Sequence, residues 1–113
     1  MVGLLNAAAG IEVVAECADG SEVLAVAAAA EPDVVMMDMR MPLTSGADAT
    51  RKLLSQLPAV RVLMLTGSIT SGGLLEAAQA GAVGYLIKGG DGNALITAVR
   101  RVAAGGTAWP VEF

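Results

Sequence analysis

The chain has 113 residues, of which 55% are hydrophobic and 3% aromatic, so it fits a single domain with an aliphatic core. Its formal net charge is −4 and its seven Lys and Arg are scattered along the sequence, which argues against direct nucleic-acid binding. Because the chain has no histidine, nucleophiles activated by histidine and metal sites that use histidine are excluded.

The first residues predict a short helix and then a strand. Residues 2–9 are typical of a helix ended by Gly10, and the β-branched run at 11–15 indicates a strand. Residues 1–10 carry no positive charge and are too short an apolar stretch for a signal peptide or a membrane span. The single cysteine, Cys17, excludes an internal disulfide and fits a reducing compartment. We therefore expect a cytoplasmic domain that binds no membrane.

A helix and a strongly apolar strand come next. Asp19 or Ser21 can cap a helix over 22–30, which ends before a proline because the residue preceding proline resists the α conformation. Four apolar residues and then Asp38 make up 34–38, a run typical of a strand buried on both faces. Asp38 would then lie at the carboxyl end of the strand, where ligands bind in open parallel sheets.

The remaining elements alternate between helices and strands. Their predicted order is a loop at 42–46, a helix at 47–57, a strand at 61–66, a loop at 67–73, a weak helix at 74–80, a strand at 83–88 and a helix at 93–104. Pro58 and Gly81 end the first two of these helices, and Asp91 caps the last. This alternation predicts an α/β fold with a parallel sheet and helices on both faces.

Three of the predicted strands end in a polar residue. These residues are Asp38, Thr66 and Lys88, spaced by about one βα unit each. Because parallel strands end at one edge, we expect a carboxylate, a hydroxyl and an ammonium to meet there. Such a set supports phosphoryl transfer, with Asp38 as nucleophile, Lys88 offsetting charge and Thr66 donating a hydrogen bond. A divalent ion would bridge the carboxylate and phosphoryl oxygens.

Several motifs at this edge resemble the receiver domain of two-component response regulators. They are the run from Asp38 to Pro42, Gly46, Leu65-Thr66, Gly81-Ala82 and the run from Gly84 to Lys88. The runs at 51–53 and 98–105 are similar to those of receivers that precede a LuxR-type helix-turn-helix. The resemblance covers nearly the whole chain. It implies a flavodoxin-like three-layer sandwich and a single receiver-like domain over residues 1–113, with no effector domain present.

The resemblance also implies roles for particular residues. It makes Asp38 the phosphoacceptor for a histidine kinase, with Thr66 and Lys88 binding the phosphoryl group. The main-chain carbonyl of Arg40 would join Asp38 as a magnesium ligand. Tyr85 would be the aromatic switch whose rotamer follows Thr66. The last two helices and the strand between them would form an output face that controls transcription, so the chain would be a signalling module and not an enzyme.

The sequence departs from the family pattern at its beginning. Receivers begin with a strand that ends in two adjacent acids, which hold Mg²⁺, whereas residues 2–5 resemble the helix after that strand. We therefore expect the first strand and the acidic pair to be missing and Mg²⁺ binding to be weak or absent. Two smaller departures are Ser45, where the family prefers Asp or Asn, and Gly89, where it often has proline.

The missing strand would be an interior one, because the family's sheet order is 2-1-3-4-5. Its absence would leave main-chain groups of 34–38 unpaired, each at a cost of about 1–3 kcal/mol if buried. The strands at 11–15 and 34–38 can close up, a second copy can fill the gap by strand exchange, or the chain folds poorly. We favour a homodimer, since the mean hydropathy of +0.65 supports a surface that needs a partner.

Simpler interpretations stay open beside these. Asp38 can be a strand-end cap, Thr66 a hydroxyl that satisfies its own loop, Lys88 a surface lysine and Tyr85 a core aromatic. A receiver without the metal acids could serve only as a protein–protein dimerisation module. A small phosphatase that uses Asp38 as its nucleophile is a remote third interpretation, because the chain lacks an evident general acid and a second domain.

Overall fold

The computed structural model describes residue 10 and residues 19–41 and 44–110. The elements in these residues are η1 (Gly20–Glu22), α2 (Val23–Ala30), β1 (Val34–Asp38), α3 (Gly46–Gln56), β2 (Arg61–Thr66), α4 (Ser71–Ala80), β3 (Gly84–Ile87) and α5 (Gly92–Ala103). The predicted helix at 2–9 and strand at 11–15 lie outside the described residues. No helix in the described part has the length and apolarity needed to cross a bilayer.

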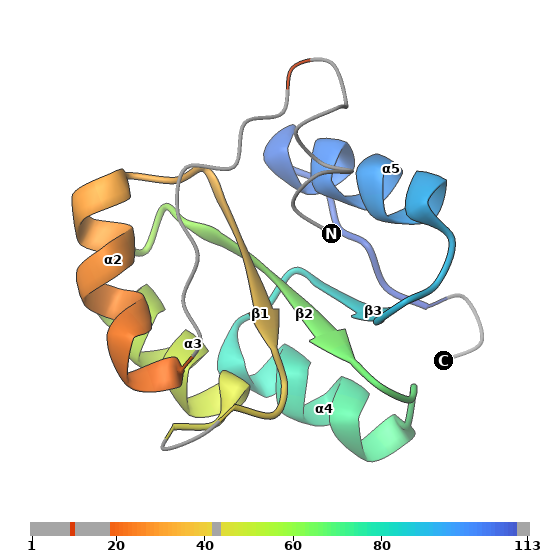
Figure 1. Ribbon diagram of the computed structural model, residues 1–113, viewed down its shortest axis with the longest axis horizontal. Helices are drawn as coiled ribbons and strands as arrows, with labels where there is room; N and C mark the ends of the chain where they lie inside the picture. Colours follow the sequence, from red (N-terminus) through yellow and green to blue (C-terminus); the bar gives the residue numbers. More distant parts are fainter. Residues whose placement is uncertain (1–9, 11–18, 42–43, 111–113) are drawn as a thin grey trace.

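The three strands form one parallel sheet in the order β1-β2-β3. Asp38 pairs in register with Leu65, and Thr66 pairs with Ile87, so the three strands end at the same rim. Figure 1 shows α3 and α4 on one side of the sheet and α5 on the other, as in a three-layer sandwich. The predicted α/β class with a parallel sheet is therefore confirmed.

Side chains that alternate along the strands fill a core on each face of the sheet. Met37, Met64 and Tyr85 belong to the cluster that packs against α2, α3 and α4. Leu63 belongs to the cluster that packs against α5. β2 is the middle strand and is covered on both faces, which explains why its sequence is a continuous apolar run and does not alternate with polar residues.

A short segment after α5 extends the sheet beyond β3. Ala108 forms an isolated parallel bridge with Gly84. The Tyr85 N–H donates to the Ala108 carbonyl at 3.0 Å, and the Ala108 N–H donates to the Val83 carbonyl at 3.0 Å. A Cβ at position 84 would lie 2.5 Å from Leu63 Cδ1 and 3.0 Å from the Ala108 carbonyl oxygen, so glycine permits this close approach.

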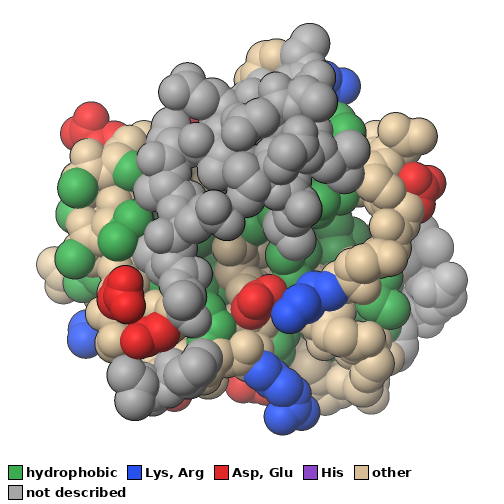
Figure 2. Space-filling view, viewed as in Figure 1, with side chains coloured by type: hydrophobic (Ala, Val, Ile, Leu, Met, Phe, Trp, Pro, Cys, Tyr) green, Lys and Arg blue, Asp and Glu red, His purple; other side chains and the backbone are tan. Residues whose placement is uncertain are grey.

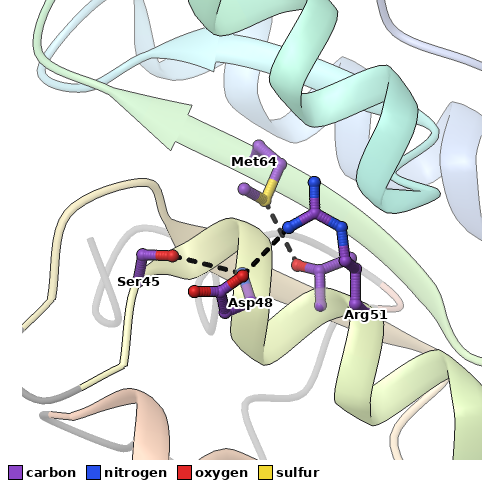
Figure 3. Close-up of polar contacts among 5 residues, drawn as sticks. Ser45, Asp48, Arg51 and Met64 are labelled. Atoms are coloured by element: carbon purple, nitrogen blue, oxygen red, sulfur yellow. Dashed lines mark hydrogen bonds and ion pairs between the residues drawn. The ribbon is translucent and has the colours of Figure 1, made fainter.

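Helix α3 is fixed at its start by a cap and across its length by polar contacts. Ser45 Oγ accepts the Asp48 N–H at 3.2 Å, and the exposed Asp48 and Arg51 form an ion pair at 2.9 Å (Figure 3). The buried Thr50 hydroxyl donates to Met64 Sδ at 3.4 Å and so links the helix to β2. Helix α3 thus has a buried face, which includes Thr50 and Leu53, and an exposed face that carries the ion pair.

The predicted start of the fourth helix is wrong. Residues 67–73 were expected to form a loop, but α4 begins at Ser71 and contains Gly72 and Gly73 in its first turn. Thr70 explains the earlier start, because its Oγ1 accepts the Gly73 N–H at 2.9 Å. A threonine cap of this kind satisfies a donor at the helix N-terminus and offsets the poor helix propensity of glycine.

The start of α2 differs in detail from the expectation, whereas its end agrees with it. Asp19 Oδ1 accepts the Ser21 N–H at 2.7 Å, but it caps the 3₁₀ turn η1, and α2 begins only at Val23. After Ala30 the chain turns at Glu31, which adopts the left-handed conformation with φ 51° and ψ 53°. The Glu31 N–H donates to the Ala27 carbonyl at 2.9 Å and closes the helix. The predicted end at residue 30 is confirmed.

Candidate functional site

The rim where the three strands end brings Asp38 and Lys88 together. Lys88 Nζ lies 3.4 Å from Asp38 Oδ2, and the two side chains are 46% and 39% exposed respectively. The Lys88 N–H donates to the Thr66 carbonyl at 2.6 Å, which fixes the lysine backbone to the end of β2. Figure 2 shows acidic and basic side chains close together on this face. Since both groups reach solvent, the pair adds about 0–1 kcal/mol to stability, and its charges stay available to a ligand.

The loop that follows Asp38 is held close to the sheet by main-chain bonds. The Met39 N–H donates to the Leu65 carbonyl at 2.8 Å, and the Gly46 N–H donates to the Met39 carbonyl at 3.0 Å. A Cβ at position 46 would overlap the Asp38 carbonyl oxygen and lie 2.9 Å from Met39 Cα. Glycine at the start of α3 thus lets the helix lie directly against the backbone of the candidate phosphoacceptor.

Thr66 lies at the same rim, but its hydroxyl is engaged within its own loop. Thr66 Oγ1 donates to the Ser68 carbonyl at 2.9 Å and accepts the Ser68 N–H at 3.3 Å. Asp38 pairs with Leu65, the residue before Thr66. Thr66 in turn pairs with Ile87, the residue before Lys88. The structure therefore brings the hydroxyl to the expected strand end, where it bonds its own loop and neither charged side chain.

Tyr85 points into the protein and is only 1% exposed. Its ring packs in the cluster that includes Met64 and Ala77, and its hydroxyl donates to the Ser68 carbonyl at 3.4 Å. The Ser68 carbonyl thus accepts hydrogen bonds from both Thr66 and Tyr85. The sequence interpretation missed Ser68, and no residue pattern could have found it, because the contact is made by a main-chain atom.

The described residues do not by themselves form a magnesium site. The resemblance to receiver domains implies Mg²⁺ at the site of phosphorylation. In the described part of the chain, no group of three or more His, Cys, Asp or Glu is placed to hold a metal ion. Asp38 is already paired with Lys88, and with the Arg40 carbonyl it would supply only part of the octahedral oxygen shell that Mg²⁺ requires.

Two hollows in the described residues lie away from this rim. One of about 380 Å³ is lined by α5, Leu86 and Trp109, and one of about 320 Å³ lies where α2 and α3 end. Neither is lined by Asp38, Thr66 or Lys88. At the rim itself, the side chains of Lys88 and Asp38 reach solvent, since they are 46% and 39% exposed.

Comparison with known proteins agrees with this geometry. The family described as "Response regulator receiver domain" matches residues 1–100. The transcriptional regulatory protein LnrK of Bacillus subtilis is 38% identical over 113 residues, which are 100% of this chain and 51% of LnrK. The DNA-binding transcriptional activator DevR/DosR of Mycobacterium tuberculosis is 40% identical over 105 residues, covering 93% of this chain and 48% of that protein. The chain spans about half the length of these curated relatives.

Solved structures agree in fold and in sequence. A crystal structure of a two-component response regulator of the LuxR family from Aurantimonas sp. SI85-9A1 superposes with a TM-score of 0.92 at 34% identity. The match covers 98% of this chain and 79% of that one. The fold is therefore that of a flavodoxin-like receiver, and the chain belongs to the response regulator receiver domain family, among relatives that are LuxR/NarL-type regulators.

Proposed function

We propose that this receiver domain accepts a phosphoryl group on Asp38 from a histidine kinase. An Asp38 carboxylate oxygen attacks the phosphorus of a phosphohistidine as the P–N bond breaks, and the bonding electron pair stays on the imidazole nitrogen. The product is an aspartyl phosphate on Asp38. The observation that supports this most is the pair of Asp38 and Lys88, whose Nζ and Oδ2 atoms lie 3.4 Å apart at an accessible rim.

In this proposal Lys88 and Thr66 bind the transferred group. The ammonium of Lys88 offsets the negative charge of the phosphoryl oxygens, and catalysis of this kind depends on positioning and charge stabilisation. The Thr66 hydroxyl, which now donates to the Ser68 carbonyl at 2.9 Å, turns to donate to a phosphoryl oxygen. The Ser68 carbonyl then keeps only the hydrogen bond from Tyr85. Because Tyr85 belongs to the buried cluster, this change links phosphorylation to the core.

The output surface in this proposal comprises α4, β3 and α5. Leu75 on α4 is 58% exposed and Ile87 on β3 is 49% exposed, and these are large apolar side chains available to a protein partner. Because the relatives are named as transcriptional regulators, we propose that transcription is the process that this signalling pathway controls. The chain itself works as one cytoplasmic signalling unit, and not as an enzyme or a DNA-binding module.

Phosphorylation can be measured directly. We would incubate the protein with phosphoramidate, a small P–N donor, in buffer containing Mg²⁺ and record the intact mass. We expect a gain of one phosphoryl group in the wild type and none in Asp38→Asn. Asp48→Asn is the matched control, because Asp48 is an exposed carboxylate that pairs with Arg51 on α3. A wild type that gains nothing at saturating donor would refute the proposal.

A second candidate function is a degenerate receiver that only assembles with a copy of itself. It is favoured by one observation: the described residues do not supply the carboxylates of a magnesium site. In the described part, β1 has a strand neighbour on one edge, which is compatible with a homodimer formed by strand exchange. Light scattering coupled to size-exclusion chromatography distinguishes the two, since a monomer that accepts phosphate excludes this candidate.

A further inference from the structure

Gly72 and Gly73, both in the first turn of α4, differ in the space available for a side chain. A Cβ at Gly73 would overlap the Tyr85 hydroxyl oxygen and lie 3.1 Å from Tyr85 Cζ. A Cβ at Gly72 would have nothing within 4 Å. The two positions share the same helical turn and nearly the same cost in helix propensity, so propensity does not distinguish them. The phenol of Tyr85 thus occupies the space that a side chain at position 73 would need.

The first turn of α4 and the backbone of Tyr85, which lie on the two sides of this contact, are each held by other hydrogen bonds. Thr70 Oγ1 accepts the Gly73 N–H at 2.9 Å, and the Thr70 carbonyl accepts the Leu74 N–H at 3.0 Å, so the start of α4 is held in place. Ala77, one turn further along α4, is fully buried in the same cluster as Tyr85. The backbone of Tyr85 is bound to the Ala108 carbonyl. The part that can move is the tyrosine side chain, by rotation about its side-chain bonds.

We propose that Gly73 is a steric gate that admits the Tyr85 ring to its inward position and so couples the first turn of α4 to the phosphorylation site. The path is short. The Tyr85 hydroxyl donates to the Ser68 carbonyl, and the Thr66 hydroxyl donates to the same oxygen. A side chain at position 73 expels the phenol and takes one donor from Ser68. The regulatory meaning of this gate rests on the proposed function, but the gate itself is a property of packing.

The chain contains one tyrosine, which makes its position measurable without interference. Protein labelled with ¹³C-tyrosine gives one aromatic spin system, and a soluble paramagnetic chelate attenuates its signal in proportion to exposure. We expect the wild type and Gly72→Ala to be attenuated equally little. We expect Gly73→Ala to be attenuated several-fold more, because its ring has moved toward solvent. Equal attenuation in the two alanine variants would overturn the proposal.

Stability provides a second, independent test of the same contact. Gly72→Ala should raise the urea midpoint, since alanine favours the helix and meets no atom. Gly73→Ala should lower the midpoint despite the same helical gain. Combining Gly73→Ala with Tyr85→Phe removes the hydroxyl that the new Cβ would overlap, so the midpoint should recover toward that of Tyr85→Phe alone. Failure of phenylalanine to rescue the variant would contradict the gate.

Different experiments would refute the gate and the proposed function. If the wild type takes up no phosphoryl group, the proposed function fails, while the exposure of the Tyr85 ring in Gly73→Ala still tests the gate. If both hold, phosphorylation should shift the amide resonances of Gly73 and Leu74 in the wild type and in Gly72→Ala. In Gly73→Ala those shifts should be lost. Shifts of the same size in all three proteins would refute the coupling and leave phosphorylation intact.

Discussion

Replacing Gly46 with alanine should destabilise the protein, because α3 begins against the backbone of Asp38. The new Cβ would overlap the Asp38 carbonyl oxygen and lie 2.8 Å from the Asp38 carbonyl carbon, and neither atom can rotate away. Overpacking of this kind costs about 1–3 kcal/mol, and losing the 3.0 Å bond from the Gly46 N–H to the Met39 carbonyl adds roughly 1 kcal/mol. Helix propensity returns at most about 1 kcal/mol. The last two terms roughly cancel, which leaves a net loss of about 1–3 kcal/mol, and we expect its upper part because the obstacle is main chain.

Urea denaturation followed by fluorescence measures this loss, since the single tryptophan, Trp109, packs against the core that contains Met37 and Tyr85. Gly67→Ala is the matched control, because a Cβ at position 67 would have nothing within 4 Å. It should keep the wild-type free energy of unfolding. If Gly46→Ala unfolds at the same urea concentration as Gly67→Ala, the close approach of α3 to Asp38 is not as described.

Three further predictions concern single side chains. Lys88→Met should abolish phosphoryl uptake, measured by intact mass, while changing the free energy of unfolding by less than about 1 kcal/mol because the pair with Asp38 is half exposed; a loss of several kcal/mol would mean that the pair is structural. Glu31→Gly should raise the thermal midpoint, with a gain of up to about 1 kcal/mol, because glycine adopts a φ of 51° without strain; a lower midpoint would contradict the left-handed turn. Thr50→Val should be neutral within about 1 kcal/mol in urea, since the hydroxyl donates to a weak acceptor, Met64 Sδ, at 3.4 Å; a larger loss would show that this contact is strong.

The strands were predictable because burial on both faces leaves a simple signature. Residues 34–37 and 62–65 are continuous apolar stretches, each followed by a polar residue, and the structure has β1 and β2 at the predicted bounds, 34–38 and 61–66. Asp38 and Lys88 were predicted to meet because parallel strands end at one rim, and their side chains lie 3.4 Å apart. Topology alone was enough to bring these two groups together.

Other features depend on contacts that the sequence does not display. Gly72 and Gly73 were interpreted as loop residues from propensity, but the hydroxyl of Thr70 outweighs that propensity by capping the helix. The inward position of Tyr85 depends on the space at Gly73, which only the packing of α4 on β3 defines. The Ser68 carbonyl is a main-chain group, and every residue type carries one. The sequence therefore located the charged groups of the site but not the contacts that restrain its hydroxyls.

The segment that pairs with β3 has a mechanical consequence. Ala108 is bound to the Tyr85 N–H and the Val83 carbonyl by two bonds of 3.0 Å each. Tension applied at residue 110 would load those two bonds before any other part of the sheet, and it would reach the backbone of the one tyrosine directly. A force at residue 110 would therefore act on β3 sooner than on β1, which has no hydrogen bond to Ala108 in the described part of the chain.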